Sequence, residues 1–204
     1  MSNVSKVSTI VKRKTVTEIC VFVLLVLVGV VARLYFQYLP NFAPVAALAL
    51  FAGYYFRSRI AAIAVPLLVM VVSDRFIGGY QFYLMVTVYT TLSLPVIARS
   101  AARKWFRPAA ASWHQNAWGG TRVLCTTFAF SMLFFLVTNL AVWIWSGIYD
   151  HSFSGLAYCY VQAIPFLRYT LMGDLAFAFA LFGGYAVIAN AAYSMAQARF
   201  SLER

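Results

Sequence analysis

Charged side chains inside apolar stretches are the first candidates for chemistry in this sequence. Asp74 ends one apolar run, Asp174 lies within another, and Arg33 lies near the end of a third. Ionisable residues in such positions usually face a protein interior or a wet cavity, where they pair with one another or contact a ligand. We predict that Arg33 is the counter-charge of Asp174, with Asp74 competing for it. Such a pair either holds helices together or faces a ligand.

Amide and aromatic side chains extend this set. Asn139 lies within an apolar run, where a buried amide needs hydrogen-bond partners from a neighbouring helix or from a ligand. Aromatic residues gather at the ends of the same runs, and an interfacial belt of rings accounts for some of them but not for the acids and amides. The candidate ligand-binding residues are Arg33, Asn41, Asp74, Asn139, Trp143, Tyr149, Tyr158 and Asp174.

The composition defines the elements that must position these residues. Of the 204 residues, 63% are hydrophobic and only 10% are charged, against about 25% charged in soluble domains. The apolar runs are continuous rather than alternating, which favours membrane-spanning helices over a β-barrel. The sequence therefore predicts an all-α, polytopic membrane protein in one domain. Six spans are expected, at about 17–37, 42–56, 60–74, 81–98, 123–146 and 170–192.

The basic residues indicate how the chain is oriented. With six spans, 13 of the 16 Lys and Arg residues fall on the side of the N-terminus. Positive charge is concentrated on the cytoplasmic side of membrane proteins, so we predict that both termini lie inside. The net charge of +11 does not indicate nucleic-acid binding, because the basic residues flank apolar spans. The basic segment 99–122 is interpreted as an interfacial loop beside anionic lipid or as a docking surface for a cytoplasmic partner.

The second expected span is short for a helix that crosses a bilayer. In LPNFAPVAALALFAGYYFRSR (39–59), we predict that Asn41 caps the helix and that Pro44 lies in its first turn. Short spans often mark a binding site in membrane proteins, so the N-terminus of this helix should face an outer cavity. Small residues on the second and sixth spans should allow close helix packing: Ala43, Ala46, Ala47, Ala49, Ala52, Gly53, Ala176, Ala180 and Gly184.

The longest outer connection is expected at 147–170. This segment, GIYDHSFSGLAYCYVQAIPFLRYT, is too apolar and aromatic for a free linker, so we predict a lid over the outer mouth. Cys159 within it is interpreted as an apolar filler, as a reactive thiol or as a ligand to a soft metal centre in a bound molecule.

Several local patterns resemble a known group of proteins. The segments NFAPVAALALFAGYYF, VPLLVMVVSD, YDHSFSGLAYCYVQAIPF and GDLAFAFALFG are similar to an uncharacterised group of bacterial inner-membrane proteins. That group in turn resembles the substrate-capture (S) components of energy-coupling factor vitamin transporters at the level of the fold. The resemblance implies capture of a vitamin-like molecule from outside. It also implies association with a transmembrane coupling subunit and its cytoplasmic ATPases.

The resemblance places binding residues at the outer helix ends, where Asn41, Asp74, Tyr149, Tyr158 and Asp174 fall. One departure concerns the first span, because many S components carry small residues there at four-residue spacing to contact the coupling subunit. Here that span has only Gly29 and Ala32, which are not so spaced. The second and sixth spans are the alternative docking surfaces, unless the protein acts alone.

Three functions follow from these observations. The first is a solute-binding transport subunit in the bacterial inner membrane. The second is a membrane scaffold or assembly protein that acts through the basic segment 99–122. The third is an intramembrane enzyme built on His151, Ser152 and Ser154. The sequence contains no two-histidine metal motif and no phosphate-binding fingerprint, so we predict no enzymatic activity, no metal and no cofactor.

Overall fold

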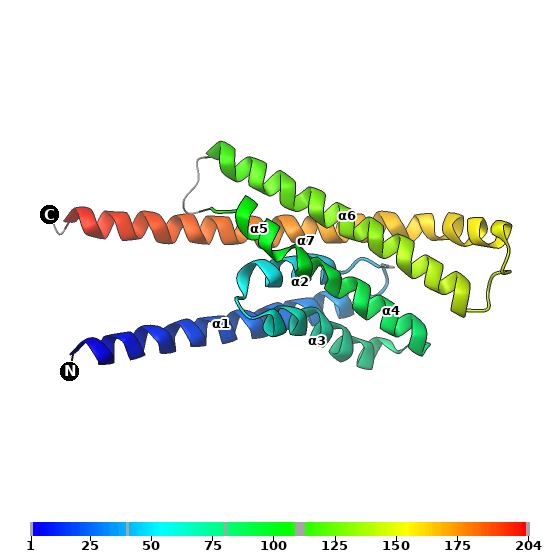
Figure 1. Ribbon diagram of the computed structural model, residues 1–204, viewed down its shortest axis with the longest axis horizontal. Coiled ribbons are helices and arrows are strands. Elements are labelled where there is room, and N and C mark those ends of the chain that lie inside the picture. Colours follow the sequence, from blue (N-terminus) through cyan, green and yellow to red (C-terminus); the bar gives the residue numbers. More distant parts are fainter. Residues whose placement is uncertain (1, 40, 80, 109–112, 203–204) are drawn as a thin grey trace.

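The computed structural model describes residues 2–39, 41–79, 81–108 and 113–202. The regular elements of this part of the chain are all helices, with no β-strand, as the composition predicted (Figure 1). The elements are α1 (Ser2–Tyr35), α2 (Val45–Tyr55), α3 (Arg59–Ile77), α4 (Phe82–Ser93), the 3₁₀ helix η1 (Leu94–Ala98), α5 (Arg99–Trp105), α6 (Trp113–Trp145) and α7 (Phe153–Leu202).

Five helical segments within the described residues are long and apolar enough to cross a membrane. They are Thr15–Tyr35, Arg59–Ile77, Phe82–Trp105, Ala117–Trp145 and Phe153–Ala198. These lengths and compositions indicate a membrane protein. The second predicted span is different, because α2 has 11 residues and is therefore only about 16 Å long, against about 30 Å for the hydrocarbon core.

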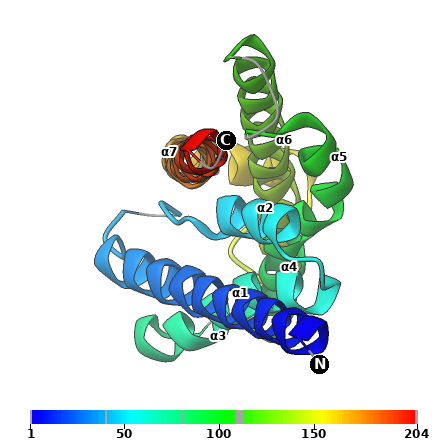
Figure 2. The same cartoon turned by 90° about the vertical axis from the view of Figure 1, so that its left-hand side faces the viewer.

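The short helix α2 lies at the centre of the molecule. Every residue from Val45 to Gly53 is buried, and α2 packs against α3, η1 and α7, with α1, α4, α5 and α6 also in contact (Figure 2). A helix that is apolar on all sides is stable when neighbouring helices surround it. Its alanines are almost completely inaccessible, so the expected close packing around Ala46, Ala47, Ala49, Ala52 and Gly53 is confirmed. The same expectation for Ala176, Ala180 and Gly184 of α7 is wrong, because these residues are exposed.

The predicted cap of α2 is wrong. Pro44 occupies the N-cap position and no side chain of this segment caps the helix, while Asn41 lies three residues earlier with a left-handed φ of 61°. Asparagine tolerates this conformation better than most residues. At the other end of α2, a link of only three residues leads to α3, where the Ser58 hydroxyl accepts a hydrogen bond from the N–H of Ala61.

The predicted lid is also wrong. Residues 147–170 do not form a loop, because α7 begins at Phe153 and continues through Pro165 to Leu202. The Ser152 hydroxyl accepts a hydrogen bond from the N–H of Gly155, which is the interaction of an N-cap. The apolar and aromatic residues that suggested a lid therefore belong to the first turns of a long helix. The segment 99–122 likewise contains α5 and the start of α6.

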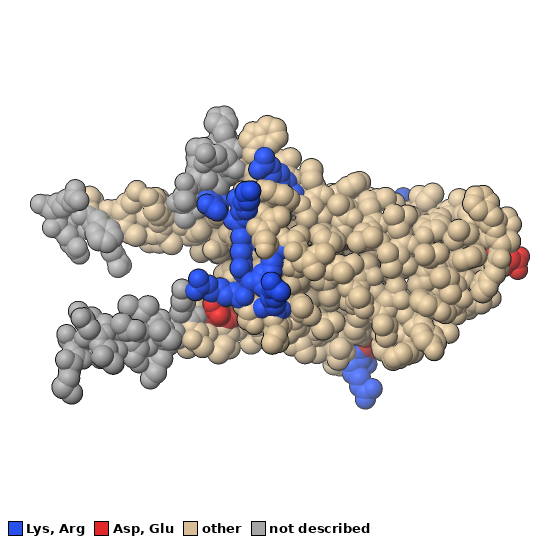
Figure 3. Space-filling view, in the orientation of Figure 1, with Lys and Arg blue, Asp and Glu red and all other residues tan. Residues whose placement is uncertain are grey.

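The two ends of the molecule differ in charge. Both termini lie at one end, together with the link between α2 and α3 (Figure 1). Lys and Arg side chains form a band there (Figure 3), and Arg57, Arg99, Arg103 and Arg107 surround the C-terminus of α2. We call this the basic end. The connections α1–α2, α3–α4 and α6–α7 lie at the opposite end.

We expect that adding a single methyl group at Gly29 on α1 lowers the stability of the protein. A Cβ atom at Gly29 would lie 2.5 Å from Cγ2 of Val69 and 2.7 Å from Cδ1 of Leu48, and both neighbours are completely buried. Overpacking of this kind costs about 1–3 kcal/mol. Gly29→Ala should therefore lower the melting temperature in detergent, measured by intrinsic fluorescence.

Gly183→Ala on α7 is the matched control for Gly29→Ala. Its Cβ would meet no atom within 4 Å, so the higher helix propensity of alanine should leave the melting temperature unchanged or raise it. Equal shifts for the two variants would contradict the close approach of α1 to α2 and α3.

Candidate ligand-binding cavity

Two adjoining hollows open between the N-terminus of α2 and helices α4, α6 and α7. The first has a volume of about 410 Å³ and the second of about 980 Å³. They share five lining residues and so form one continuous cavity near the end opposite the basic end: Asn41, Val88, Phe134, Thr138 and Val142. Ala43 and Val45 line the first hollow, which is consistent with the expectation that the N-terminus of α2 faces a cavity.

Arg33 lies on the wall of the first hollow, but it does not pair with Asp174. Its Nη2 atom lies 2.8 Å from Oδ1 of Asp74, and Nη1 donates to the Ser73 hydroxyl at 2.5 Å. The Tyr89 hydroxyl donates to Oδ2 of Asp74 at 2.8 Å. The Arg33 side chain is 14% exposed and that of Asp74 only 8%. This network joins α1, α3 and α4, and the pairing predicted for Arg33 is wrong.

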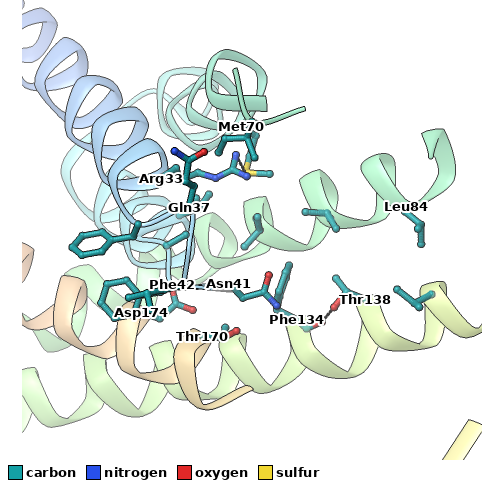
Figure 4. A pocket seen from close by; sticks show the side chains of 18 of the residues that line it. Arg33, Gln37, Asn41, Phe42, Met70, Leu84, Phe134, Thr138, Thr170 and Asp174 are labelled. Atoms are coloured by element: carbon teal, nitrogen blue, oxygen red, sulfur yellow. Dashed lines mark hydrogen bonds between the residues drawn. The ribbon is translucent and has the colours of Figure 1, made fainter. Parts of the chain in front are cut away.

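Asp174 has a different set of partners. Its Oδ2 atom accepts a hydrogen bond of 2.7 Å from the Ser131 hydroxyl on α6, and its carboxylate faces the backbone N–H groups of Ala46 and Ala47. These are unpaired donors of the first turn of α2, where negative charge is favourable. Asp174 on α7 thus provides the cap that Asn41 does not. In Figure 4 it lies beside Phe42, whereas Arg33 is directed toward Met70.

A close approach of α7 to the connection before α2 makes this cap possible. A Cβ atom at Gly173 would lie 3.1 Å from the backbone nitrogen of Ala43. The missing side chain lets α7 come near enough for the adjacent Asp174 to reach the helix end.

Asn139 lines the second hollow beside α7. Its side-chain amide nitrogen donates to the carbonyl of Phe135 in its own helix at 2.7 Å, and its backbone carbonyl accepts from the Cys159 thiol at 3.5 Å. Tyr160 donates to the carbonyl of Leu136 at 2.7 Å. These contacts fix α6 against α7, and the burial of Cys159 agrees with the filler interpretation of this residue.

Aromatic residues form the far wall of the second hollow. The rings of Tyr149 and Tyr158 lie 6.0 Å apart, and the Tyr158 hydroxyl accepts from the Gln162 amide at 2.5 Å. Trp143 lines neither hollow, because its indole donates to the carbonyl of Asp150 at 2.9 Å and its ring contacts His151. Trp143 therefore holds the α6–α7 connection in place.

The structure brings most of the predicted site residues to one cavity. Asp74 and Trp143 are the two that do not line it, and Asp74 lies directly behind Arg33. Sequence reasoning missed several lining residues. Two of them could have been predicted from their position in the sequence. Thr138 is next to the predicted residue Asn139, and Thr170 lies one helical turn before the predicted residue Asp174. The missed polar and aromatic residues are Phe36, Gln37, Phe42, Phe134, Thr138, Asp150, Ser154, Gln162, Phe166 and Thr170.

Comparison with known families adds one finding. The model of a family described as "Family of unknown function (DUF6580)" matches residues 13–197. The chain belongs to this family. The match includes all the cavity residues, so the cavity is part of the region that defines DUF6580. No curated protein and no solved structure matches the chain.

The residues considered for catalysis have structural roles in this DUF6580 chain. Ser152 caps α7 and also lies 2.9 Å from the Ser154 hydroxyl. His151 contacts the Trp143 ring. Among the described residues, no acid or base is hydrogen-bonded to either serine, which is the pairing that activates a serine nucleophile.

Proposed function

We propose that this protein is a substrate-binding subunit for membrane transport, comparable to the S components of vitamin transporters. It captures a small ring-bearing molecule in the cavity beside the N-terminus of α2. The volumes of the two hollows, about 410 and 980 Å³, support this proposal, since each lies within the range of about 300–1,000 Å³ that is usual for binding sites of small molecules. Its walls combine aromatic rings with a few polar groups, as such sites do.

The partners of the two charged groups indicate the kind of ligand. Arg33 forms an ion pair with Asp74. The Asp174 carboxylate accepts hydrogen bonds from Ser131 and from the N-terminus of α2. Apart from Asp150, which is exposed where it lines the second hollow, the polar groups left to face a ligand are therefore neutral amides and hydroxyls. Buried charges without a counter-charge are costly, so a site of this type favours a neutral, ring-bearing vitamin-like molecule over a strongly charged one.

The proposed topology follows from the charge distribution. We place the basic end in the cytoplasm of a bacterial cell, with six passes through the inner membrane and both termini inside. In this arrangement α2 is the second pass along the chain and adds to the five long helical segments. Its short length is compatible with the membrane because protein rather than lipid surrounds it. The cavity then opens toward the outside, where a solute for uptake is met.

Energised uptake would require a partner such as a transmembrane coupling subunit with cytoplasmic ATPases. The buried helix α2 is not available for docking, and Gly29 of α1 is covered by α2 and α3. The small residues Ala176, Ala180 and Gly184 of α7 are exposed, so α7 is the docking surface that we propose.

The scaffold hypothesis has less support. It assigns the function to the basic segment 99–122, but Arg99 and Arg103 within it point toward the protein. They donate to the carbonyls of Tyr54, Phe56 and Arg57 at the C-terminus of α2. Their charge thus stabilises the end of a helix, as basic groups at this position do.

Filling the cavity should abolish ligand capture. Thr138 lines both hollows, so the indole of Thr138→Trp would occupy the space where they join. Protein purified from cells would be denatured, and the small molecules that it releases would be identified by mass spectrometry. We expect a compound in amounts near one per wild-type chain and at least a tenfold loss in the variant, because a ligand cannot share this volume.

Thr121→Trp is the matched control. Thr121 also lies on α6, bonds to the carbonyl four residues earlier, as Thr138 does, and is exposed. It should retain the compound. Release of the same amount from Thr138→Trp, at an unchanged melting temperature, would show that the cavity is not the binding site.

A further inference from the structure

A separate groove, distinct from the two hollows of the ligand cavity, opens on the side of the molecule. It has a volume of about 730 Å³ and lies between α3 and the segment formed by α4, η1 and the start of α5. These elements meet near the C-terminus of α3 and separate toward the basic end (Figures 1 and 2). Apolar residues line most of this lateral groove: Ile63, Leu67, Met85, Val86, Leu94, Val96 and Ile97.

The groove has the depth of one leaflet. Along α3 its lining runs from Arg59 to Leu67, a rise of about 12 Å. Half of a hydrocarbon core measures about 15 Å. The residues at its rim face outward, since Ile97 is 72% and Val86 45% exposed. A chain lying in this groove would therefore run from the membrane surface to about the middle of the bilayer.

Positive charge is placed at the end of the groove that reaches the membrane surface. Arg59 and Arg99 line it there, beside the Ser100 hydroxyl. Arg59 is exposed and forms no ion pair with any residue that the structure describes. It is also the first residue of α3, where a cation is unfavourable for the helix dipole. Its charge does not stabilise the fold and is free for an external anion.

We propose that the groove between α3 and α4 binds an anionic phospholipid of the leaflet at the basic end. One acyl chain lies between Ile63, Leu67 and Val86, and the phosphate contacts Arg59 and those N–H groups of Arg99 that do not donate to the carbonyls of Phe56 and Arg57. This binding site is independent of the proposed capture of a solute, because the groove shares no lining residue with the cavity at the N-terminus of α2.

The combination of features favours a lipid over other occupants. A polar solute would leave the long apolar wall without a partner, and a purely apolar helix would leave Arg59 without a counter-charge. A phospholipid satisfies both parts of the groove, since its chain covers the apolar wall and its phosphate accepts hydrogen bonds from arginine.

The experiment uses the full-length protein purified in a neutral detergent. Native mass spectrometry would follow titration with phosphatidylglycerol and, in parallel, phosphatidylcholine. We expect one phosphatidylglycerol to bind at least tenfold more tightly than further lipids. Arg59→Gln should weaken this binding about fivefold, which is the contribution of one basic residue near a membrane surface. Thr90→Trp, which fills the groove from α4, should abolish the tight site.

Two variants control for general effects of charge and bulk. Arg75→Gln removes an exposed arginine outside the groove, and Val71→Trp enlarges an exposed residue on the same helix. Both should bind phosphatidylglycerol like the wild type. The proposal is overturned if Arg59→Gln and Arg75→Gln have equal effects, if phosphatidylcholine binds equally tightly, or if Thr90→Trp retains the tight site. A dimer that Thr90→Trp dissociates would identify a second copy as the occupant instead.

Discussion

Asp74→Ala is expected to destabilise the protein by about 3–5 kcal/mol, because it leaves a buried arginine without its counter-charge. Arg33 lies 2.8 Å from Asp74 in a site where both side chains are largely inaccessible, and Tyr89 would lose its acceptor at the same time. The measurement is thermal or chemical unfolding in detergent. We expect a large fall in melting temperature and a low yield of folded protein.

A double variant separates the structural role of the pair from any contact with a ligand. Arg33→Met together with Asp74→Leu removes both charges and keeps comparable volume, and such replacements are often neutral or stabilising. The double variant should therefore be more stable than Asp74→Ala alone. Arg33 also lines the cavity, so recovery of stability without recovery of the bound compound would show that Arg33 contacts the ligand. Additive losses in the double variant would contradict the ion pair.

Asp174→Ala should destabilise the protein by about 1–3 kcal/mol or more, because it leaves buried backbone donors without an acceptor. Asp174 lies on α7, yet its carboxylate serves Ser131 on α6 and the first turn of α2. Its loss should loosen the N-terminus of α2, which forms part of the cavity wall. We expect lower melting temperature and weaker ligand retention together, with faster hydrogen exchange in residues 45–49.

Asp174→Asn is the conservative comparison. The Ser131 hydroxyl has one hydrogen but contacts two acceptors, Oδ2 of Asp174 and the carbonyl of Thr127. An amide nitrogen at position 174 would donate to Ser131 and free its hydrogen for Thr127, while the amide oxygen faces α2. Stability should therefore stay close to that of the wild type. A loss as large as that of Asp174→Ala would show that the negative charge itself is required.

The main features of the fold were predictable because they depend on composition and local pattern. Long apolar runs identify α1, α3, α6, α7 and the continuous segment of α4, η1 and α5 as helices that can cross a membrane. The boundaries were less predictable, as at Phe153, where α7 begins 17 residues before the predicted position 170. Aromatic residues and an internal proline look like a loop in sequence, but Ser152 caps the start of α7 and the helix continues through Pro165.

The candidate site was predictable in its residue types and less so in its pairings. Charged and amide residues within apolar runs must find partners, which is why Arg33, Asp174 and Asn139 could be singled out. Which partner each one finds depends on the rotation and depth of separate helices. Those quantities are set by packing contacts such as that of Gly173 with Ala43, and no local pattern encodes them.

The sequence by itself determined that this is a helical chain with the composition of a membrane protein, with few buried charges and basic residues concentrated toward one face. Those properties follow from the cost of placing polar groups in hydrocarbon, which acts on each residue separately. Only the tertiary structure decided that α2 is a buried helix, that Asp74 pairs with Arg33 and that Asp174 caps α2. Such choices depend on distances between residues far apart in the chain, and they arise when helices pack together.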